Sequence, residues 1–335
     1  MMNVVRSRTY SFLTAVAMAF AAASVQAAGF QRGYAADPAG KPLEIGIWYP
    51  SAATPRPVTM GPTTMSVAFN SSIDGQALPL VVISHGTGGS FLNHYDTAIA
   101  LANAGYVVAA VTHAGDNYAD QSRSILVMDR SRQMRHVIDH MLASWDSRAS
   151  IDPQKIGMFG FSAGGFTALV NIGGIPDLAK VAPMCHEYPD DFACRQIAKT
   201  STAKLAPSES NLGGDSRIKT AVVIAPALGF TFEPAGLQAV KVPVQLWGAA
   251  DDVVLPPPRF TEAVRRAMPA EPEYHVVQLA GHYDFLAPCS DAMALIAPAI
   301  CSSKPGFDRA AFHDSFNDKV VRFFNATISG DPRLR

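Results

Sequence analysis

Short apolar runs alternate with longer amphipathic stretches along most of the chain from Leu43 onward. Runs rich in Val and Ile, without alternation of polar and apolar positions, are typical of strands that are buried on both faces. The short apolar runs predict strands over residues 44–48, 78–84, 106–112, 155–159, 220–225, 242–247 and 273–279, and several of these are of this Val/Ile-rich type. Because helix-length segments separate them, the pattern predicts an α/β fold with a mostly parallel central sheet and helices on both of its faces.

Two longer segments carry apolar residues every three or four positions, which is the spacing of one face of an α-helix. The first stripe lies within residues 134–145 and the second within residues 312–323. The stripes consist of Met134, Val137, Ile138, Met141, Leu142 and Trp145, and of Phe312, Phe316, Val320 and Phe323. We expect both helices to pack on the predicted sheet.

Two segments break the alternation of strands and helices. Residues 173–217 are irregular and end in a Ser/Gly/Asn-rich stretch. Loops of this length inside a compact domain are usually functional or flexible, so we interpret this segment as a cap inserted over the active side of the sheet. A surface excursion without substrate contact is the alternative. Residues 286–308 form a second excursion, and residues 28–335 as a whole are expected to form a single α/β domain.

The first 27 residues have the composition of a secretory signal peptide. Arg6 and Arg8 precede a largely apolar run over residues 12–23, and small residues end at Ala27 in a cleavage-type pattern. The alternative, a membrane anchor, needs about 20 apolar residues to span a bilayer. No later apolar run reaches that length. The sequence therefore predicts export, to the periplasm or as a secreted protein, without stable membrane insertion.

Export changes how the four cysteines are interpreted. Oxidising compartments favour disulfides over free thiols or zinc. Four cysteines allow three pairings, and the two short local loops favour Cys185 with Cys194 and Cys289 with Cys301. The chain has no Cys-x-x-Cys and no Cys/His cluster of zinc-finger spacing, so no metal site is predicted.

Composition and charge exclude other classes of protein. The chain has 335 residues, of which 48% are hydrophobic and 16% are charged, so it can bury a large core and is not disordered. Its formal net charge is −1, and it has no run of five or more basic residues. We therefore expect no nucleic-acid partner.

A Gly-x-Ser-x-Gly motif at residues 160–164 follows one predicted strand and begins a helix. This is the context of a nucleophile elbow, in which a sharp turn between strand and helix exposes a reactive serine. Side chains two residues before and after that serine would collide with neighbouring backbone, which explains the glycines at both positions. Ser162 is therefore the candidate nucleophile.

A serine nucleophile needs a base within hydrogen-bond reach and an acid that orients the base. In this type of site the chain order is serine, acid, histidine. Asp251 follows the predicted strand at 242–247, and His282 follows the strand at 273–279, so both lie at the carboxyl ends of strands. We choose Asp251 because it is the first carboxylate after its strand, and Asp252 stays the alternative.

The remaining requirement is a set of donors for the oxyanion of an acyl-transfer intermediate. Residues 85–89, His-Gly-Thr-Gly-Gly, follow the predicted strand at 78–84 and provide a flexible turn with backbone N–H groups. We assign the N–H groups of Thr87 and Ala163 as the two donors. A phosphate-binding loop is excluded because no Gly-Lys-Ser/Thr follows the glycines.

Taken together, these motifs resemble those of α/β-hydrolases, and in particular the exported dienelactone-hydrolase-like and platelet-activating-factor-acetylhydrolase-like serine esterases. The resemblance runs from about Leu43 to the C-terminus. It implies an α/β-hydrolase fold with an inserted cap, and catalysis by Ser162, His282 and Asp251. The chain departs from true dienelactone hydrolases, which carry a cysteine at the elbow, and from many lipases and polyester hydrolases, which carry Met where Ala163 stands.

The sequence thus predicts an exported serine hydrolase that cleaves small-molecule carboxylic esters through an acyl-enzyme, without a metal or organic cofactor. The nearest alternative is a peptidase or amidase with the same triad. A third reading, a binding protein on an inactive hydrolase scaffold, is disfavoured because the serine, acid, histidine and oxyanion loop are all present.

Overall fold

A ten-stranded sheet runs through the protein, which we describe from a computed structural model for residues 27–198 and 213–329. The predicted signal peptide, except Ala27, lies outside the described residues. The strands are β1 (Ala27–Ala35), β2 (Leu43–Ser51), β3 (Arg56–Met60), β4 (Thr63–Phe69), β5 (Leu78–Ser84), β6 (Val107–Thr112), β7 (Ile151–Phe161), β8 (Ile218–Ile224), β9 (Val244–Ala249) and β10 (Glu273–Val277).

The strand order is β10-β9-β8-β7-β5-β6-β2-β1-β4-β3. The six strands from β10 to β6 pair in parallel, whereas β2 pairs antiparallel with both β6 and β1. After β5 the chain adds β6 on one side and later returns to place β7 on the other side. The loops that follow β5 and β7 therefore leave the sheet side by side, which is where open α/β sheets bind ligands.

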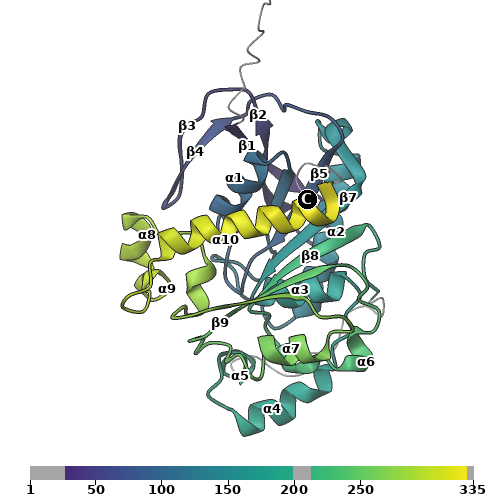
Figure 1. Cartoon of the computed structure of the whole chain (residues 1–335), viewed down its shortest axis with the longest axis vertical. Helices are drawn as coiled ribbons and strands as arrows, with labels where there is room; N and C mark the ends of the chain where they lie inside the picture. Colours follow the sequence, from purple (N-terminus) through teal and green to yellow (C-terminus); the bar gives the residue numbers. More distant parts are fainter. Residues whose placement is uncertain (1–26, 199–212, 330–335) are drawn as a thin grey trace, which may run out of the picture.

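Helices cover both faces of the sheet, as the sequence pattern predicts. The helices are α1 (Tyr95–Asn103), α2 (Val127–Ala143), α3 (Ala163–Asn171), α4 (Val181–Glu187), α5 (Phe192–Ala198), α6 (Pro234–Leu237), α7 (Thr261–Ala267), α8 (Asp291–Ile296), α9 (Pro298–Cys301) and α10 (Arg309–Phe324). Figure 1 shows α10, in yellow, crossing the sheet beside α1, and the short helices α4 and α5 at the end of the molecule away from the β3–β4 hairpin. Among the described residues, no helix combines the length and apolar character needed to cross a bilayer.

Two hydrophobic cores lie on the two faces of the sheet. Leu80 and Val82 of β5 pack in the core beneath α2, α3 and α7, whereas Val81 and Ile83 pack in the core beneath α1 and α10. Successive side chains of a strand point to opposite faces, so a continuous apolar run supplies both cores. This is the physical reason why the strands predicted from unbroken Val/Ile runs are all present in the sheet.

Both excursions contain short helices. The segment 173–217, expected to be irregular, holds a 3₁₀ turn at Leu178–Lys180 followed by α4 and α5. The segment 286–308 holds α8 and α9. Each is closed by one disulfide, Cys185–Cys194 in the first and Cys289–Cys301 in the second, so the two pairings predicted from loop length are the ones that form.

Candidate active site

The turn between β7 and α3 holds Ser162 in a backbone conformation that non-glycine residues rarely adopt, with φ of 56° and ψ of −117°. A Cβ atom at Gly160 would lie 2.1 Å from the Gly164 carbonyl oxygen, and one at Gly164 would lie 1.9 Å from the Ser84 oxygen. Neither position can hold a side chain without moving backbone. The predicted steric reason for both glycines is therefore met, and the turn is a strand-to-helix elbow.

Ser162, His282 and Asp252 form a continuous hydrogen-bonded chain. The Oγ atom of Ser162 lies 3.0 Å from Nε2 of His282, and Nδ1 of His282 lies 2.7 Å from Oδ2 of Asp252. All three residues are buried. They come from the loops that follow β7, β9 and β10, so parallel strands of one half of the sheet bring together residues that are up to 120 positions apart.

The prediction that Asp251 contacts His282 is wrong, and the alternative, Asp252, takes that place. The N–H of Asp251 donates to the Ala280 carbonyl at 3.0 Å, while its half-exposed carboxylate accepts from Nζ of Lys304 at 2.8 Å. The next side chain turns inward, and Oδ1 of Asp252 accepts the N–H groups of Val254 and Leu255 at 2.9 and 2.7 Å. Asp252 thus has every oxygen engaged, which fixes its orientation.

The loop after β5 lies against the elbow. Thr87, Ser162 and Ala163 line the same cavity. The N–H groups of Gly88 and Gly89 donate within the protein, to Oδ1 of Asp116 at 3.0 Å and to the Gly86 carbonyl at 3.2 Å. The N–H groups of Gly88 and Gly89 are therefore engaged in holding the loop, whereas Thr87 lines the cavity.

A buried ion pair supports this loop from below, and sequence reasoning missed it. Nη1 of Arg130 lies 2.7 Å from Oδ2 of Asp116, and Nη2 of Arg130 donates to the His85 carbonyl. Asp116 follows β6 at the same end of the sheet as Asp252 and His282. The signal that could have found it is therefore the one that pointed to Asp251 and Asp252, an acid just after a parallel strand.

Two buried histidines, His85 and His113, lie in or beside this loop. Burial, and then the positive charge of Arg130, lower the pKa of both His85 and His113 well below the usual value. Nε2 of His85 accepts the N–H of His113 at 3.1 Å, which requires that nitrogen to be unprotonated. The loop thus rests on a neutral imidazole and one compensated ion pair.

The cavity beside Ser162 has a volume of about 90 Å³ and is lined mostly by apolar side chains. Its walls come from the loop before α2, from α2 itself, from the 173–217 segment and from Leu255. The residues contributed by the 173–217 segment are Leu178, Val181, Phe192, Ala193, Gln196 and Ile197. Described residues of this segment therefore line the same cavity as Ser162. Among the described residues, no group of His, Cys, Asp and Glu could hold a metal ion.

Comparisons with known proteins bear on the fold and on the class of protein. A family model described as "Dienelactone hydrolase family" matches residues 67–224, which include the loop after β5, the elbow and β8. A solved ferulic acid esterase from Streptomyces cinnamoneus superposes with a TM-score of 0.63 and 20% sequence identity, over 95% of this chain and 94% of that chain. At this identity the likeness concerns the fold, which confirms the predicted α/β-hydrolase architecture. No curated protein gave a significant match.

Proposed function

We propose that the chain is a serine hydrolase that cleaves carboxylic esters through a Ser162–His282–Asp252 triad. The match of residues 67–224 to the dienelactone hydrolase family model supports the hydrolase class. The observation that carries this proposal is the pair of contacts made by His282, at 3.0 Å to Ser162 Oγ and at 2.7 Å to Asp252. A base in reach of a hydroxyl, oriented in turn by a buried acid, is the arrangement that activates serine.

In the proposed reaction, Nε2 of His282 takes the proton of Ser162 as Oγ attacks the ester carbonyl carbon. Asp252 keeps the other ring nitrogen protonated and stabilises the imidazolium that forms. The tetrahedral intermediate collapses, His282 returns the proton to the leaving alkoxide, and the alcohol departs. Water then attacks the acyl-enzyme with His282 again as base, and the carboxylic acid leaves Ser162 free.

The N–H groups of Thr87 and Ala163 are the proposed oxyanion donors. Ala163 is the first residue of α3, where backbone N–H groups have no partner within the helix and the helix dipole favours negative charge. Thr87 belongs to the loop that Asp116 and Arg130 support, between the two residues that they bind, His85 and Gly88. Loss of one such donor typically costs about 3 kcal/mol of transition-state stabilisation.

We further propose that the protein acts outside the cytoplasm, in the periplasm or as a secreted enzyme. Its two disulfides support an oxidising location. The signal peptide predicted over residues 1–27 would provide the route, and N-terminal sequencing of the exported protein tests the predicted cleavage after Ala27.

The proposal is tested with p-nitrophenyl esters of graded acyl length and a matched set of p-nitroanilides. We expect ester turnover in the wild type and a loss of more than about 1,000-fold in Ser162→Ala. Ser315→Ala, which changes an exposed serine on α10, is the control and should retain full turnover. Turnover of anilides alone would replace the esterase with an amidase, and a fully active Ser162→Ala would refute the mechanism.

A further inference from the structure

The turn that carries His282 is held by a carboxylate that the triad does not use. His282 begins a 3₁₀ turn that ends at Phe285. Oδ2 of Asp284, within this turn, accepts the N–H of Gly281 at 2.7 Å. Asp284 is 2% exposed, and a carboxylate buried to this degree needs a charged partner.

That partner is Arg309, the first residue of α10, which is itself buried. Nε of Arg309 lies 3.0 Å from Oδ1 of Asp284, and Nη2 lies 3.0 Å from the same oxygen. Ser303 adds a third bond to this oxygen, from Oγ at 2.5 Å. The ion pair with Arg309 therefore holds the Asp284 carboxylate in place. This carboxylate in turn holds the backbone of Gly281, next to His282.

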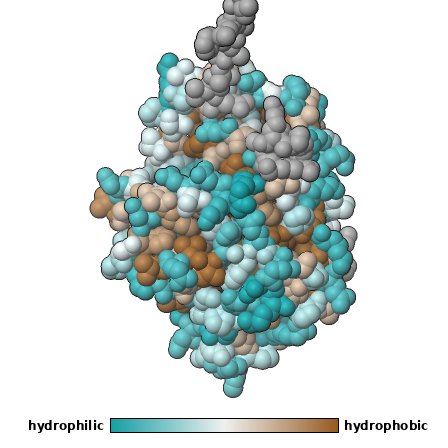
Figure 2. Space-filling view, in the orientation of Figure 1, coloured by the Kyte–Doolittle hydropathy of each residue, from teal (hydrophilic) through white to brown (hydrophobic). Residues whose placement is uncertain are grey.

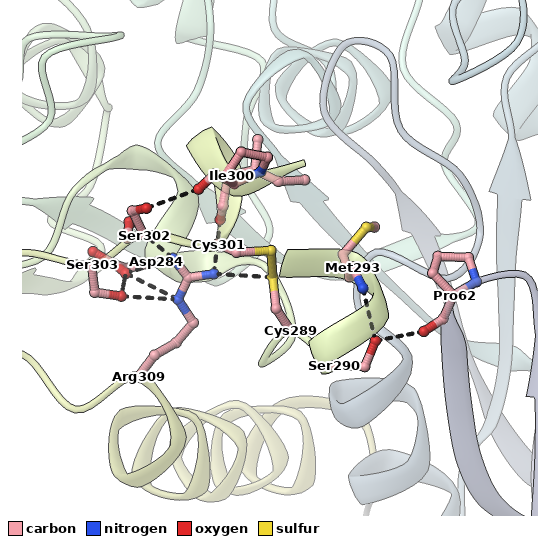
Figure 3. The surroundings of a disulfide bond; sticks show 11 residues. Pro62, Asp284, Cys289, Ser290, Met293, Ile300, Cys301, Ser302, Ser303 and Arg309 are labelled. Carbon is pink, nitrogen blue, oxygen red and sulfur yellow. Dashed lines mark hydrogen bonds and ion pairs between the residues drawn. A yellow bond between two sulfur atoms is a disulfide. The ribbon is translucent and has the colours of Figure 1, made fainter. Parts of the chain in front are cut away.

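The second excursion in turn holds Arg309 (Figure 3). Nη1 of Arg309 donates to the Ile300 carbonyl at 2.9 Å and lies 3.9 Å from Sγ of Cys289, and Nη2 donates to the Ser302 carbonyl at 3.4 Å. Ile300 and Ser302 flank Cys301, the partner of Cys289. The disulfide thus keeps in place the two carbonyls that bind the guanidinium.

One helical turn further along α10, His313 contacts the backbone carbonyl of Asp284. Nε2 of His313 lies 2.9 Å from the Asp284 carbonyl oxygen, and Nδ1 lies 2.6 Å from Oδ2 of Asp96. Positions i and i+4 share one face of a helix. Arg309 and His313 therefore form a two-point clamp on Asp284 from a single rigid element.

We propose that Arg309 and His313 are positioning residues for the base of the reaction: through Asp284 they set the place of His282 between Ser162 and Asp252, and the Cys289–Cys301 disulfide keeps Arg309 in position. This inference rests on the proposed function. A misplacement of about 1 Å in a catalytic group can cost about 100-fold in rate. The clamp touches no residue of the cavity, so its loss should lower kcat and leave KM unchanged.

The test compares Arg309→Met with Arg322→Met, which removes an exposed arginine from the same helix. We expect kcat for p-nitrophenyl butyrate to fall 10- to 100-fold in Arg309→Met with KM within twofold, and to stay at the wild-type value in Arg322→Met. Arg309→Lys, which keeps the charge but cannot bind Asp284 and both carbonyls together, should lie between them.

An NMR measurement distinguishes a positioning role of Arg309 from a role in stability alone. The His282 Nδ1 proton bonded to Asp252 should give a far-downfield ¹H NMR signal in wild type and Arg322→Met, and this signal should weaken or shift in folded Arg309→Met. If Arg309→Met does not fold, Asp284→Asn and the Cys289→Ser/Cys301→Ser pair take its place with the same expected readings. Wild-type kcat and an unchanged signal in a folded clamp variant would overturn the proposal.

Failure of the proposed function would instead show as wild-type protein that turns over no ester, while the NMR comparison would still report on the clamp.

Discussion

The two disulfide-tied excursions have the same construction but face different parts of the site. Each consists of short helices closed by a local Cys–Cys link, 9 residues apart in the cap and 12 residues apart in the α8–α9 segment. The cap places apolar side chains in the cavity that contains Ser162. The α8–α9 segment places carbonyls around Arg309, behind the turn of His282. The first excursion therefore lines the cavity beside Ser162, and the second contacts Arg309, which holds the turn of His282 through Asp284.

The two excursions also differ in how far the apolar side chains of their helices are exposed. Leu295 and Ile296 of α8 are 84% and 70% exposed, and Figure 2 shows apolar residues gathered on the side of the molecule formed by α8 and α9. In the cap, Val181 and Met184 of α4 are buried. A short excursion with few core residues keeps its shape through its disulfide, so what each one does is decided by the residues it places next to the sheet. Changes on the base side should thus act on kcat, and changes in the cap on substrate preference.

The largest expected effect separates the two adjacent carboxylates. Asp252→Asn should lower kcat about 10,000-fold, because the amide cannot hold His282 in the reactive tautomer or stabilise its positive charge. Asp251→Asn should change kcat less than twofold, because the half-exposed carboxylate of Asp251 binds Lys304 at the surface and not His282. Steady-state kinetics on p-nitrophenyl butyrate measure both. Equal losses in the two variants would contradict the assignment of Asp252.

An intermediate effect is expected on the cap side. Val181→Phe adds volume to the cavity wall and should lower kcat/KM for an octanoate ester about 10-fold relative to an acetate ester. Ile175→Phe is the matched control, since Ile175 lies in the same segment but is 52% exposed and does not line the cavity. An unchanged octanoate-to-acetate ratio in Val181→Phe would show that the acyl group does not bind beneath the cap.

The smallest expected effect concerns stability and pH on the base side. Burial lowers the pKa of His94 to about 4 from 6.5. Below pH 6.5 the unfolded chain therefore binds a proton that the folded protein excludes, so the free energy of unfolding falls by about 1.4 kcal/mol per pH unit for this residue as the pH drops from 6.5 toward 4. His85 and His113 add to the same slope.

His94→Phe tests this account, because a phenyl ring keeps the packing against Phe159 and Phe161 and does not titrate. Urea unfolding at pH 6.5, 6.0 and 5.5 should give a shallower loss of stability in the variant than in the wild type. Identical slopes would mean that His94 takes up its proton in the folded protein.

How much of the molecule the sequence predicts follows from how each part is stabilised. Strands buried on both faces, such as β5, appear as unbroken apolar runs, and the elbow at Ser162 appears as a fixed motif. In contrast, β3 and β4 are partly exposed and contain Thr and Pro, so they lack such a run and were not predicted. The choice between Asp251 and Asp252 depends on which side chain turns inward after β9, and the clamp on Asp284 depends on α10 packing beside a distant loop. Neither feature can be predicted from the residues near it in the sequence.

The central claim, that Ser162 becomes acylated by an ester substrate, has one direct measurement. The protein is mixed with excess p-nitrophenyl butyrate, quenched in acid within the first turnover, and examined by intact mass spectrometry and peptide mapping. The account predicts a butyryl group on Ser162 in the wild type, together with a burst of p-nitrophenol, and neither in Ser162→Ala. Ester turnover without any acyl group on Ser162, or an acyl group that persists in Ser162→Ala, would contradict it.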